Sequence, residues 1–455
     1  MTKNNEVPNL QMKILDLGTK GEAIGKVDGF TYFVKGAIPE DVIEFKPLII
    51  KKNFGIGKLI KIITPSAKRV APKCALASRC GGCQIQEMAY QEQLKYKNKK
   101  ITDSLERIGK ITCPILPIIG MEEPYYYRNK TQFVVGENKN QVQIGLYSIY
   151  THNIVDIETC HIMPKEASFI IQKIKIFLKE KNISIYHELK HHGLLRHVII
   201  RTTFNAGTPE FMVIFVINGR EFPKQEALIN LLQTIPGVIS LAININLDKG
   251  DSIYGSKTNL IWGEPYLTEV ISGIKFLISP RSFFQINPVQ SENLIKAALD
   301  FIDPKGNELV LDAYSGIGLF SLALSKKVKL VIGIEILEEA ILDAQKNAEL
   351  NGIENAEFIL GNVEEVLPKL VEKNGFLPDI ILIDPPRKGC EKIVLETIIK
   401  IAPEKIVYVS CNPDTLARDL AFLCMHNYKV AKVQPIDMFP HTVHIESICL
   451  LVKTL

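Results

Sequence analysis

The segment ELVLDAYSGIG, residues 308–318, decides the fold. A strand-like run ends at Asp312, and a turn containing Gly316 and Gly318 leads into a run of helical type. Glycine in such a turn lets the backbone approach a ligand closely. The segment therefore predicts the start of a parallel sheet with a ligand site outside its carboxyl ends.

Residues 279–455 repeat this alternation. Helical segments separate the apolar runs ELVLDAY, VIGIE, EFILGN, DIILIDPP and KIVYVSCNP. Asn287 and Pro288 are a good cap and first turn for a helix reaching Phe301, and a further helix is expected over 413–425. Only a turn joins the last two runs, YKVAKVQPIDMF and VHIESICLLVK, so we expect an antiparallel pair at one edge. This is an α/β, doubly wound sheet on the plan of class I (Rossmann-like) methyltransferases.

Two further domains are expected before this sheet, because 455 residues exceed one hydrophobic core. Residues 1–65 contain short glycine-punctuated runs that predict a small, OB-like β-barrel. Residues 66–278 contain the cysteine cluster and then a Lys-rich segment, 87–110, that we expect to be helical. The runs HVIIRTTF, FMVIFVING and VISLAINI and an amphipathic helix near 168–181 indicate a central α+β domain, whose topology does not follow from the sequence.

Composition excludes a membrane-spanning helix. The chain is 46% hydrophobic and 23% charged, and its longest wholly apolar runs, such as 211–217, are far short of the roughly 20 residues of a span. The N-terminal residues also lack the apolar stretch of a secretory signal, so we expect a cytoplasmic protein with no membrane partner. The net charge of +4 is uninformative, but residues 45–73 hold eight basic and no acidic side chains. That run fits either RNA phosphates or a solvated basic face.

The sheet's carboxyl edge carries the cofactor signal. Glu335 ends the strand after the glycine turn, at the spacing where a ribose diol is usually held. The turn lacks the third glycine of the dinucleotide fingerprint, and the fourth strand ends in Asp384-Pro385-Pro386-Arg387. These features favour S-adenosylmethionine over a dinucleotide, with a plain nucleotide-binding fold as the alternative.

Cys411 is the candidate nucleophile. It follows the fifth strand within Ser410-Cys411-Asn412-Pro413, on the same edge as the cofactor turn. Most cysteines are small core residues, an interpretation that suits Cys424 and Cys449 inside a helix and a strand. A strand exit before an Asn-Pro break does not fit it.

Four motifs in order resemble the RNA uridine-5-methyltransferase family, and most closely its bacterial 23S ribosomal RNA members with an N-terminal TRAM barrel and an iron-sulfur cluster. The resemblance covers nearly the whole chain. Its motifs are Phe283–Asn287, Asp384–Gly389, Ser410–Pro413 and His444–Glu446.

The resemblance implies a covalent mechanism. Carbon 5 of uracil is a poor nucleophile, so the Cys411 thiolate would first add to carbon 6 and make carbon 5 reactive toward the donor methyl group. A base must then remove the proton from carbon 5, and the resemblance assigns Glu446 to that role. It also implies cofactor contacts from Gln285, Tyr314, Glu335, Asp384 and Asn362. Phe283 becomes the candidate to stack on the extruded uridine.

Nine cysteines without a secretion signal favour metal binding or catalysis over disulfides. Cys74, Cys80 and Cys83 lie within ten residues, and Cys160 is a distant fourth thiol. Four thiolates suit a [4Fe-4S] cluster or zinc, and the resemblance favours the cluster, in a structural role. Cys113 and Cys390 remain unassigned.

The expected partner is ribosomal RNA, 23S by resemblance, bound by a monomer whose TRAM-like barrel grips RNA away from the active site. Basic groups at 127–130 and 193–197 add to that surface or are ordinary surface charge. Four alternatives stay open: a tRNA uridine-5 methyltransferase, an amino-group methyltransferase, a radical methylthiotransferase, and a non-catalytic RNA-binding or assembly protein. The sequence lacks the Cys-x3-Cys-x2-Cys signature that a radical enzyme requires.

Overall fold

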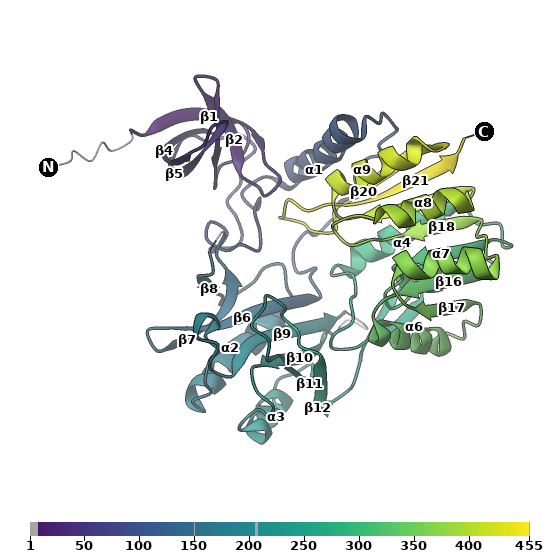
Figure 1. The fold of residues 1–455 in the computed structure, drawn as a ribbon. Coiled ribbons are helices and arrows are strands. Elements are labelled where there is room, and N and C mark those ends of the chain that lie inside the picture. Colours follow the sequence, from purple (N-terminus) through teal and green to yellow (C-terminus); the bar gives the residue numbers. More distant parts are fainter. Residues whose placement is uncertain (1–7, 150, 205–207, 455) are drawn as a thin grey trace. The chain divides into compact units, whose positions relative to one another are not determined.

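The glycine-turn segment lies in a seven-stranded sheet (Figure 1). The structure is a computed structural model that describes residues 8–149, 151–204 and 208–454. In spatial order the strands are β17 (Ala356–Leu360), β16 (Leu330–Glu335), β15 (Leu309–Ala313), β18 (Ile380–Ile383), β19 (Lys405–Ser410), β21 (Glu446–Lys453) and β20 (Tyr428–Ile436). The first five run parallel, and β21 is antiparallel to both β19 and β20. The doubly wound α/β prediction and its antiparallel edge pair are confirmed.

Helices connect the parallel strands, as right-handed crossovers require. Those between successive parallel strands are α5 (Leu319–Ser325), α6 (Glu338–Leu350), α7 (Val363–Asn374) and α8 (Lys392–Ile401). Helix α4 (Pro288–Ile302) precedes β15, and α9 (Pro413–Cys424) leads from β19 to β20. The side-chain oxygen of Asn287 caps α4 and that of Asn412 caps α9, each by accepting a backbone N–H. Proline fills the first helical position of both, where its missing N–H leaves no hydrogen bond unmade. Both predicted helix starts are therefore confirmed.

The α+β region forms a second seven-stranded sheet, here called the central sheet. Its spatial order is β12 (Lys257–Gly263), β11 (Val238–Ile245), β10 (Glu210–Ile217), β9 (Leu195–Thr203), β6 (Lys130–Asn138), β7 (Gln141–Tyr147) and β8 (Ile154–Asp156). Strands β10 and β11 are parallel, and β9 is antiparallel to both β10 and β6. The other elements of this region are α2 (Lys165–Glu180), η2 (Glu188–Lys190), α3 (Gln225–Gln233) and the hairpin of β13 (Leu267–Ile271) and β14 (Ile274–Ile278).

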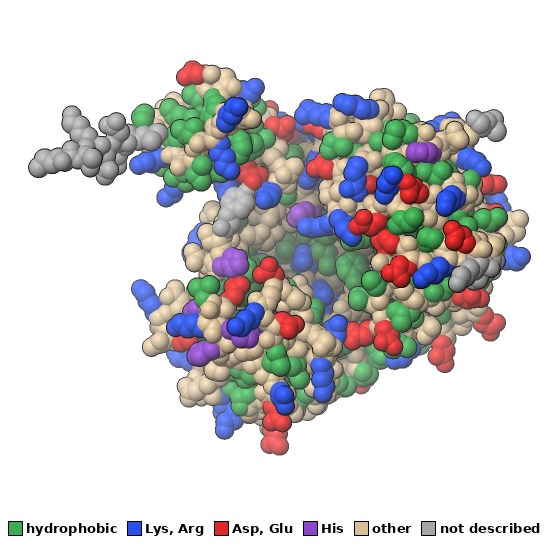
Figure 2. Space-filling view, in the orientation of Figure 1, with side chains coloured by type: hydrophobic (Ala, Val, Ile, Leu, Met, Phe, Trp, Pro, Cys, Tyr) green, Lys and Arg blue, Asp and Glu red, His purple; other side chains and the backbone are tan. Residues whose placement is uncertain are grey.

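The N-terminal strands close into the predicted barrel. In spatial order they are β1 (Leu10–Leu17), β2 (Ala23–Val27), β3 (Phe30–Val34), β5 (Phe54–Thr64) and β4 (Val42–Ile50). Gly55 and Gly57 make closure possible, because a Cβ at either position would overlap the ring of Tyr32 or Phe45 in the barrel core. Hydrophobic and basic side chains share the barrel's outer surface (Figure 2).

The Lys-rich segment is shorter than predicted. It forms α1 (Tyr90–Ser104), followed by a single π-helical turn, η1 (Leu105–Gly109). The Ser104 hydroxyl donates to the Asp414 carboxylate at 2.7 Å, so the end of α1 packs against α9. Lys110 then adopts a left-handed backbone that ends the turn.

Two compact units make up the chain. One comprises Met1–Lys97, Tyr147–Val155 and Phe439–Val443, with the barrel and the cysteine-rich loop. The other comprises Asn98–Leu146, Asp156–Met438 and His444–Leu455, with nearly all of the central sheet and the whole seven-stranded α/β sheet. Within the described ranges, no helix has the length and apolar character needed to cross a bilayer.

Candidate active site

The turn after β15 has the backbone that its glycines predict. Tyr314, Gly316 and Gly318 all have positive φ, at 69°, 55° and 87°. A Cβ on Gly316 would meet open space, whereas one on Gly318 would lie 3.1 Å from the ring of Phe358. Gly318 therefore permits close packing at the start of α5, and Gly316 leaves room for a ligand above the turn.

Glu335, at the end of β16, lies beside this turn as predicted. One carboxylate oxygen accepts the backbone N–H of Gly316 at 3.1 Å, and the other accepts that of Leu337 at 2.9 Å. The carboxylate thus ties the turn to the next strand. Its contact with a ribose stays a prediction.

Two buried acids lie behind the turn. Asp312 accepts a hydrogen bond from the Ser321 hydroxyl at 2.5 Å, but its second oxygen, Oδ1, is buried without a partner. Burial raises the pKa of Asp312 to about 7. Burial and then the charge of Asp312 raise the pKa of Asp384, which follows β18. Both carboxyls therefore favour their neutral forms until a compensating positive charge arrives.

Cys411 and Glu446 meet at the same edge of the sheet. Ser410 of β19 pairs in register with Ser447 of β21, so Cys411 and Glu446 are the next facing positions. The Glu446 carboxyl is buried, and its Oε1 accepts no hydrogen bond from any residue that the structure describes. Burial and the charge of Asp384 raise its pKa well above the ordinary value, while Arg387 opposes this rise.

The Cys411 thiol is partly buried and electrostatically coupled to the same three residues. Burial raises its pKa to about 11, and the charges of Glu446 and Asp384 add to the rise. Arg387 lowers the pKa by its charge and by a hydrogen bond to the thiol. Arg387 is thus the group in this site that favours the thiolate, which is the reactive form of cysteine.

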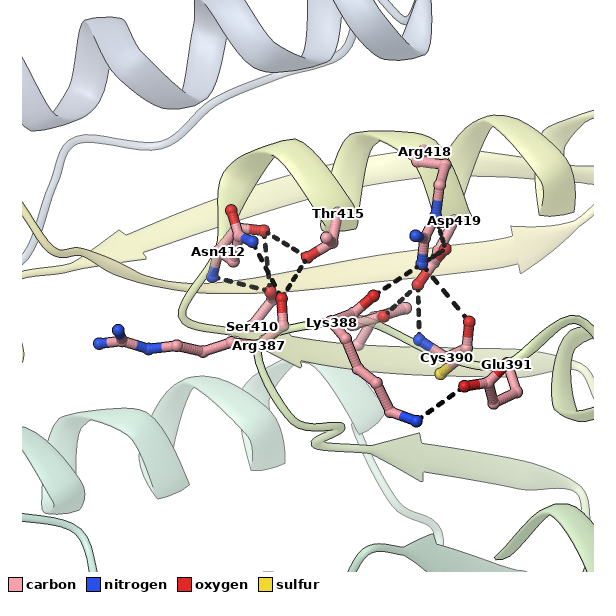
Figure 3. Close-up of polar contacts among 10 residues, drawn as sticks. Arg387, Lys388, Cys390, Glu391, Ser410, Asn412, Thr415, Arg418 and Asp419 are labelled. Atoms are coloured by element: carbon pink, nitrogen blue, oxygen red, sulfur yellow. Dashed lines mark hydrogen bonds and ion pairs between the residues drawn. The ribbon is translucent and has the colours of Figure 1, made fainter. Parts of the chain in front are cut away.

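Asn412 and its neighbours hold Arg387 in place (Figure 3). The Asn412 side chain donates to the Arg387 carbonyl at 2.9 Å, and the Thr415 hydroxyl donates to the same carbonyl at 3.2 Å. Both contacts are to the backbone, and the Arg387 side chain points away from them. The cap and first turn of α9 therefore fix the backbone of Arg387 without using its charge.

Asp419 of α9 anchors the rest of the loop after Asp384, a role that its helical position did not signal. The buried Asp419 carboxylate accepts the Cys390 backbone N–H at 2.8 Å and the Tyr408 hydroxyl at 2.7 Å. Arg418 donates to the Asp419 carboxylate at 2.8 Å and to the Lys388 carbonyl at 3.0 Å (Figure 3). Helix α9 thus holds the loop after Asp384 and contacts β19 through Tyr408.

The Tyr314 side chain contacts α7 and the loop after Asp384. Its hydroxyl donates to Glu364 in the first turn of α7 at 3.2 Å, and it lies beside the buried Cys390 thiol. Burial raises the pKa of Cys390 to about 12, which keeps this thiol neutral. Cys390 therefore lines the Tyr314 side of the site. Asn362 caps α7 with its backbone carbonyl and makes no side-chain cap.

The segment of residues 279–287 between β14 and α4, here called the strap, carries the remaining predicted residues. Phe283 is 60% exposed, which suits stacking on a base, whereas its neighbour Phe284 is buried against Phe276. Gln285 is buried, and its carbonyl accepts the Asn129 side chain at 2.9 Å. The structure thus brings Cys411, Glu446 and Asp384 together, and separates the roles of the two adjacent phenylalanines.

The cysteine-rich loop, residues 74–83, contains three of the four predicted cluster ligands. Cys74 and Cys80 interact electrostatically, and Cys80 Sγ accepts the Gly82 backbone N–H at 3.4 Å, as thiolate clusters often do. Cys160 belongs to the other compact unit. Nowhere in the described part of the chain are three or more His, Cys, Asp or Glu side chains placed to hold a metal ion. The donor chemistry of the four thiols fits a cluster.

Known proteins place these features in context. The profile of the tRNA (uracil-5-)-methyltransferase family matches residues 89–454. An uncharacterized RNA methyltransferase of Clostridium tetani is 46% identical over 99% of this chain and 97% of its own length. A relative of the same description from Halalkalibacterium halodurans is 44% identical over 99% and 98%. The solved tRNA (uracil-54, C5)-methyltransferase of Pyrococcus abyssi, in complex with S-adenosyl-L-homocysteine, is 29% identical over 97% of this chain and 100% of its own, with a TM-score of 0.78.

Proposed function

The chain belongs to the tRNA (uracil-5-)-methyltransferase family, whose members use S-adenosylmethionine, and on that premise we propose that it methylates carbon 5 of a uridine in 23S ribosomal RNA through Cys411. The observation that carries the proposal is the meeting of Cys411, Glu446 and Arg387 at the carboxyl edge of the sheet. A nucleophile and a base must both reach one pyrimidine ring, and these two face each other across neighbouring strands.

The residues divide the chemistry between them. The Cys411 thiolate, stabilised by Arg387, adds to carbon 6 and moves the electrons of the carbon 5–carbon 6 double bond onto the carbonyl oxygen. Carbon 5 then takes the methyl group from the sulfonium of S-adenosylmethionine, which leaves as S-adenosylhomocysteine. Glu446 removes the proton from carbon 5, the double bond re-forms, and the carbon–sulfur bond to Cys411 breaks.

The cofactor residues fit a cationic methyl donor. The turn at Gly316 leaves open space, and Asp312 and Asp384 are buried carboxyls that form no ion pair with the described residues. We propose that Gln285, Tyr314, Glu335 and Asp384 hold the donor, with Asn362 near its adenine and Phe283 on the extruded base. Asp312 supports this site from behind.

The RNA class needs a direct test. The Pyrococcus abyssi tRNA enzyme matches over 97% of this chain, so its match includes most or all of the N-terminal barrel. The barrel therefore does not by itself separate rRNA from tRNA substrates, and a tRNA uridine is the second candidate. The basic run of residues 45–73 suits either RNA.

Mass spectrometry of nucleosides from separated ribosomal and transfer RNA, in cells with and without the gene, decides between them. We expect 5-methyluridine to disappear from one position or more of 23S RNA and to return with the wild-type gene, but not with Cys411→Ala. Loss confined to tRNA would establish the second candidate. Unchanged 5-methyluridine in both fractions, with no methylation by the purified protein, would reject uridine methylation.

We propose that Cys74, Cys80, Cys83 and Cys160 are the ligands of a [4Fe-4S] cluster with a structural role. The support is the four-thiol donor set and the Gly82 N–H directed at Cys80. Iron, sulfide and zinc analysis of protein purified without oxygen tests this. About four iron and four sulfide ions per chain are expected, falling in Cys80→Ser; stoichiometric zinc would replace the cluster by a zinc site.

A further inference from the structure

Three cations lie together at one end of β6 and β9, two middle strands of the central sheet, on the side of the strap; this end is here called the basic edge of the central sheet. Arg128 precedes β6, Lys130 begins it, and Arg201 of β9 faces Lys130 directly in the antiparallel register. Within the described residues, none of the three forms an ion pair with a carboxylate. Like charges grouped in this way repel each other unless an anion joins them.

Arg201 has a structural use for its charge. Its side chain is buried, and one guanidinium nitrogen, Nη1, donates to the strap carbonyls of Ser279, Pro280 and Ser282 at 2.7, 3.2 and 2.8 Å. Burial lowers the pKa of Arg201 to about 10, so it remains cationic at neutral pH. The strap that carries Phe283 is therefore fixed to the central sheet through this side chain.

Lys130 has no comparable use. Its ammonium lies 5.2 Å from the ring centroid of Tyr254, whose hydroxyl donates to the Pro280 carbonyl at 3.2 Å. Burial, and then the charges of Arg201 and Arg128, lower the pKa of Lys130 to about 7. Among the described residues, this ammonium makes neither a hydrogen bond nor an ion pair.

The neighbouring strap suggests which anion would complete the cluster. Lys130 and Arg201 share one face of the sheet, and Arg201 contacts the strap that carries the exposed Phe283. A uridine stacked on Phe283 brings a phosphate on each side of its ribose into this neighbourhood. Phosphate is a strong acceptor for lysine and arginine, and it would restore full charge to Lys130.

We propose that Lys130 and Arg128 form a phosphate subsite that binds the RNA backbone beside the extruded uridine, with Arg201 linking this subsite to the strap. The inference rests on the proposed function, because it needs RNA as substrate. It makes the edge of the central sheet part of the substrate site, where the nucleotide is gripped by its backbone while its base is read elsewhere.

The test uses the full-length protein and an RNA hairpin containing the 5-methyluridine position mapped as described above. Affinity is measured across a series of salt concentrations for wild type, Lys130→Ala, Lys130→Arg and Lys179→Ala. Lys179 is an exposed lysine of α2 in the same unit, so its loss removes equal charge elsewhere. We expect the salt slope to fall by about one in Lys130→Ala and to be kept in Lys130→Arg and Lys179→Ala.

Neutral methylphosphonate linkages, placed singly around the target uridine, locate the contact. One linkage should weaken binding by the wild type and have no further effect on Lys130→Ala, because both changes remove the same interaction. Equal S-adenosylhomocysteine affinity of all variants shows that they are folded. An unchanged salt slope in Lys130→Ala, or additive losses at every linkage, would overturn the subsite.

The two proposals fail separately. If the wild type does not methylate the hairpin, uridine methylation itself is at fault. If the wild type methylates it and Lys130→Ala binds with the wild-type slope, only the phosphate subsite is wrong.

Discussion

The carboxyl edge of the α/β sheet and the edge of the central sheet bury charge of opposite sign. At the first, Asp312, Asp384 and Glu446 are buried, Asp384 acts on Glu446 and Asp312 on Asp384, and Arg387 opposes the rise in the pKa of Glu446. At the second, Arg128, Lys130 and Arg201 group together, and in the described part of the chain none of them forms an ion pair, although the charge of Asp343 acts on Arg201. Unbalanced buried charge destabilises a protein unless a ligand restores the balance. The contrast is the one that our two proposals predict, with a cationic methyl donor at the first edge and an anionic RNA backbone at the second.

The sharpest way to test the acidic edge is to remove its nucleophile. Cys411→Ala should lower methylation by roughly 10⁴-fold or more, because no other group can form the bond to carbon 6. S-adenosylhomocysteine affinity, measured by calorimetry, should stay within about threefold of wild type. Cys424→Ala, at the end of α9, is the matched control and should keep full activity. Methylation by Cys411→Ala would remove the covalent mechanism.

This edge could be predicted from the sequence because parallel strands collect their carboxyl ends. Alternation of strands and helices predicts parallel strands. The residues that follow β15, β16, β18 and β19 must therefore gather at one edge of the sheet. Glu446 needed the family resemblance, since the start of a strand alone carries no such signal. The structure adds Asp419, which acts from inside α9, where an acid is usually a solvated surface residue.

The basic edge could not be predicted in the same way. Arg128 and Lys130 stood out only as basic groups, and Arg201 not at all. Their grouping depends on the register of β6 against β9, two strands separated by more than fifty residues. Non-local antiparallel register is set by tertiary packing rather than by local pattern. Cys390, which the sequence left unassigned, likewise acquires neighbours only through the loop that Asp419 fixes.

Glu446 offers the next largest effect. Glu446→Gln keeps the shape of the side chain but cannot accept the carbon 5 proton, so turnover should fall by roughly 10²- to 10⁴-fold. The step before proton removal still proceeds, and the protein should accumulate covalently bound to methylated RNA. Denaturing gel electrophoresis detects that complex, and Glu396→Gln on α8 is the control. Loss of turnover without the trapped complex would assign Glu446 to another step.

A substitution of Arg201 tests whether the central sheet positions the strap for catalysis. Arg201→Lys keeps the charge but loses the planar group that serves three strap carbonyls at once. We expect kcat to fall by about 10- to 100-fold through misplacement of Phe283 and Gln285, with RNA affinity changed far less. A purely structural role predicts a lower melting temperature and an unchanged kcat for the folded fraction. Single-turnover rates beside thermal melts separate the two outcomes.

The smallest effect concerns pH and the charge of the donor. The pKa of Asp312 is raised to about 7 in the folded protein, so folding favours its neutral form, and this contribution to stability is lost as pH rises from about 4 to about 7. A cationic donor favours the charged form, so its affinity should rise over the same interval. We expect the affinity for S-adenosylmethionine to rise up to about tenfold between pH 6 and pH 7.5, and the affinity for S-adenosylhomocysteine, which lacks the sulfonium charge, to rise less.

Asp312→Asn should reduce the difference between the pH profiles of the two ligands. Calorimetry at three pH values measures it, and parallel pH profiles for both ligands would show that the buried acids do not balance the donor's charge.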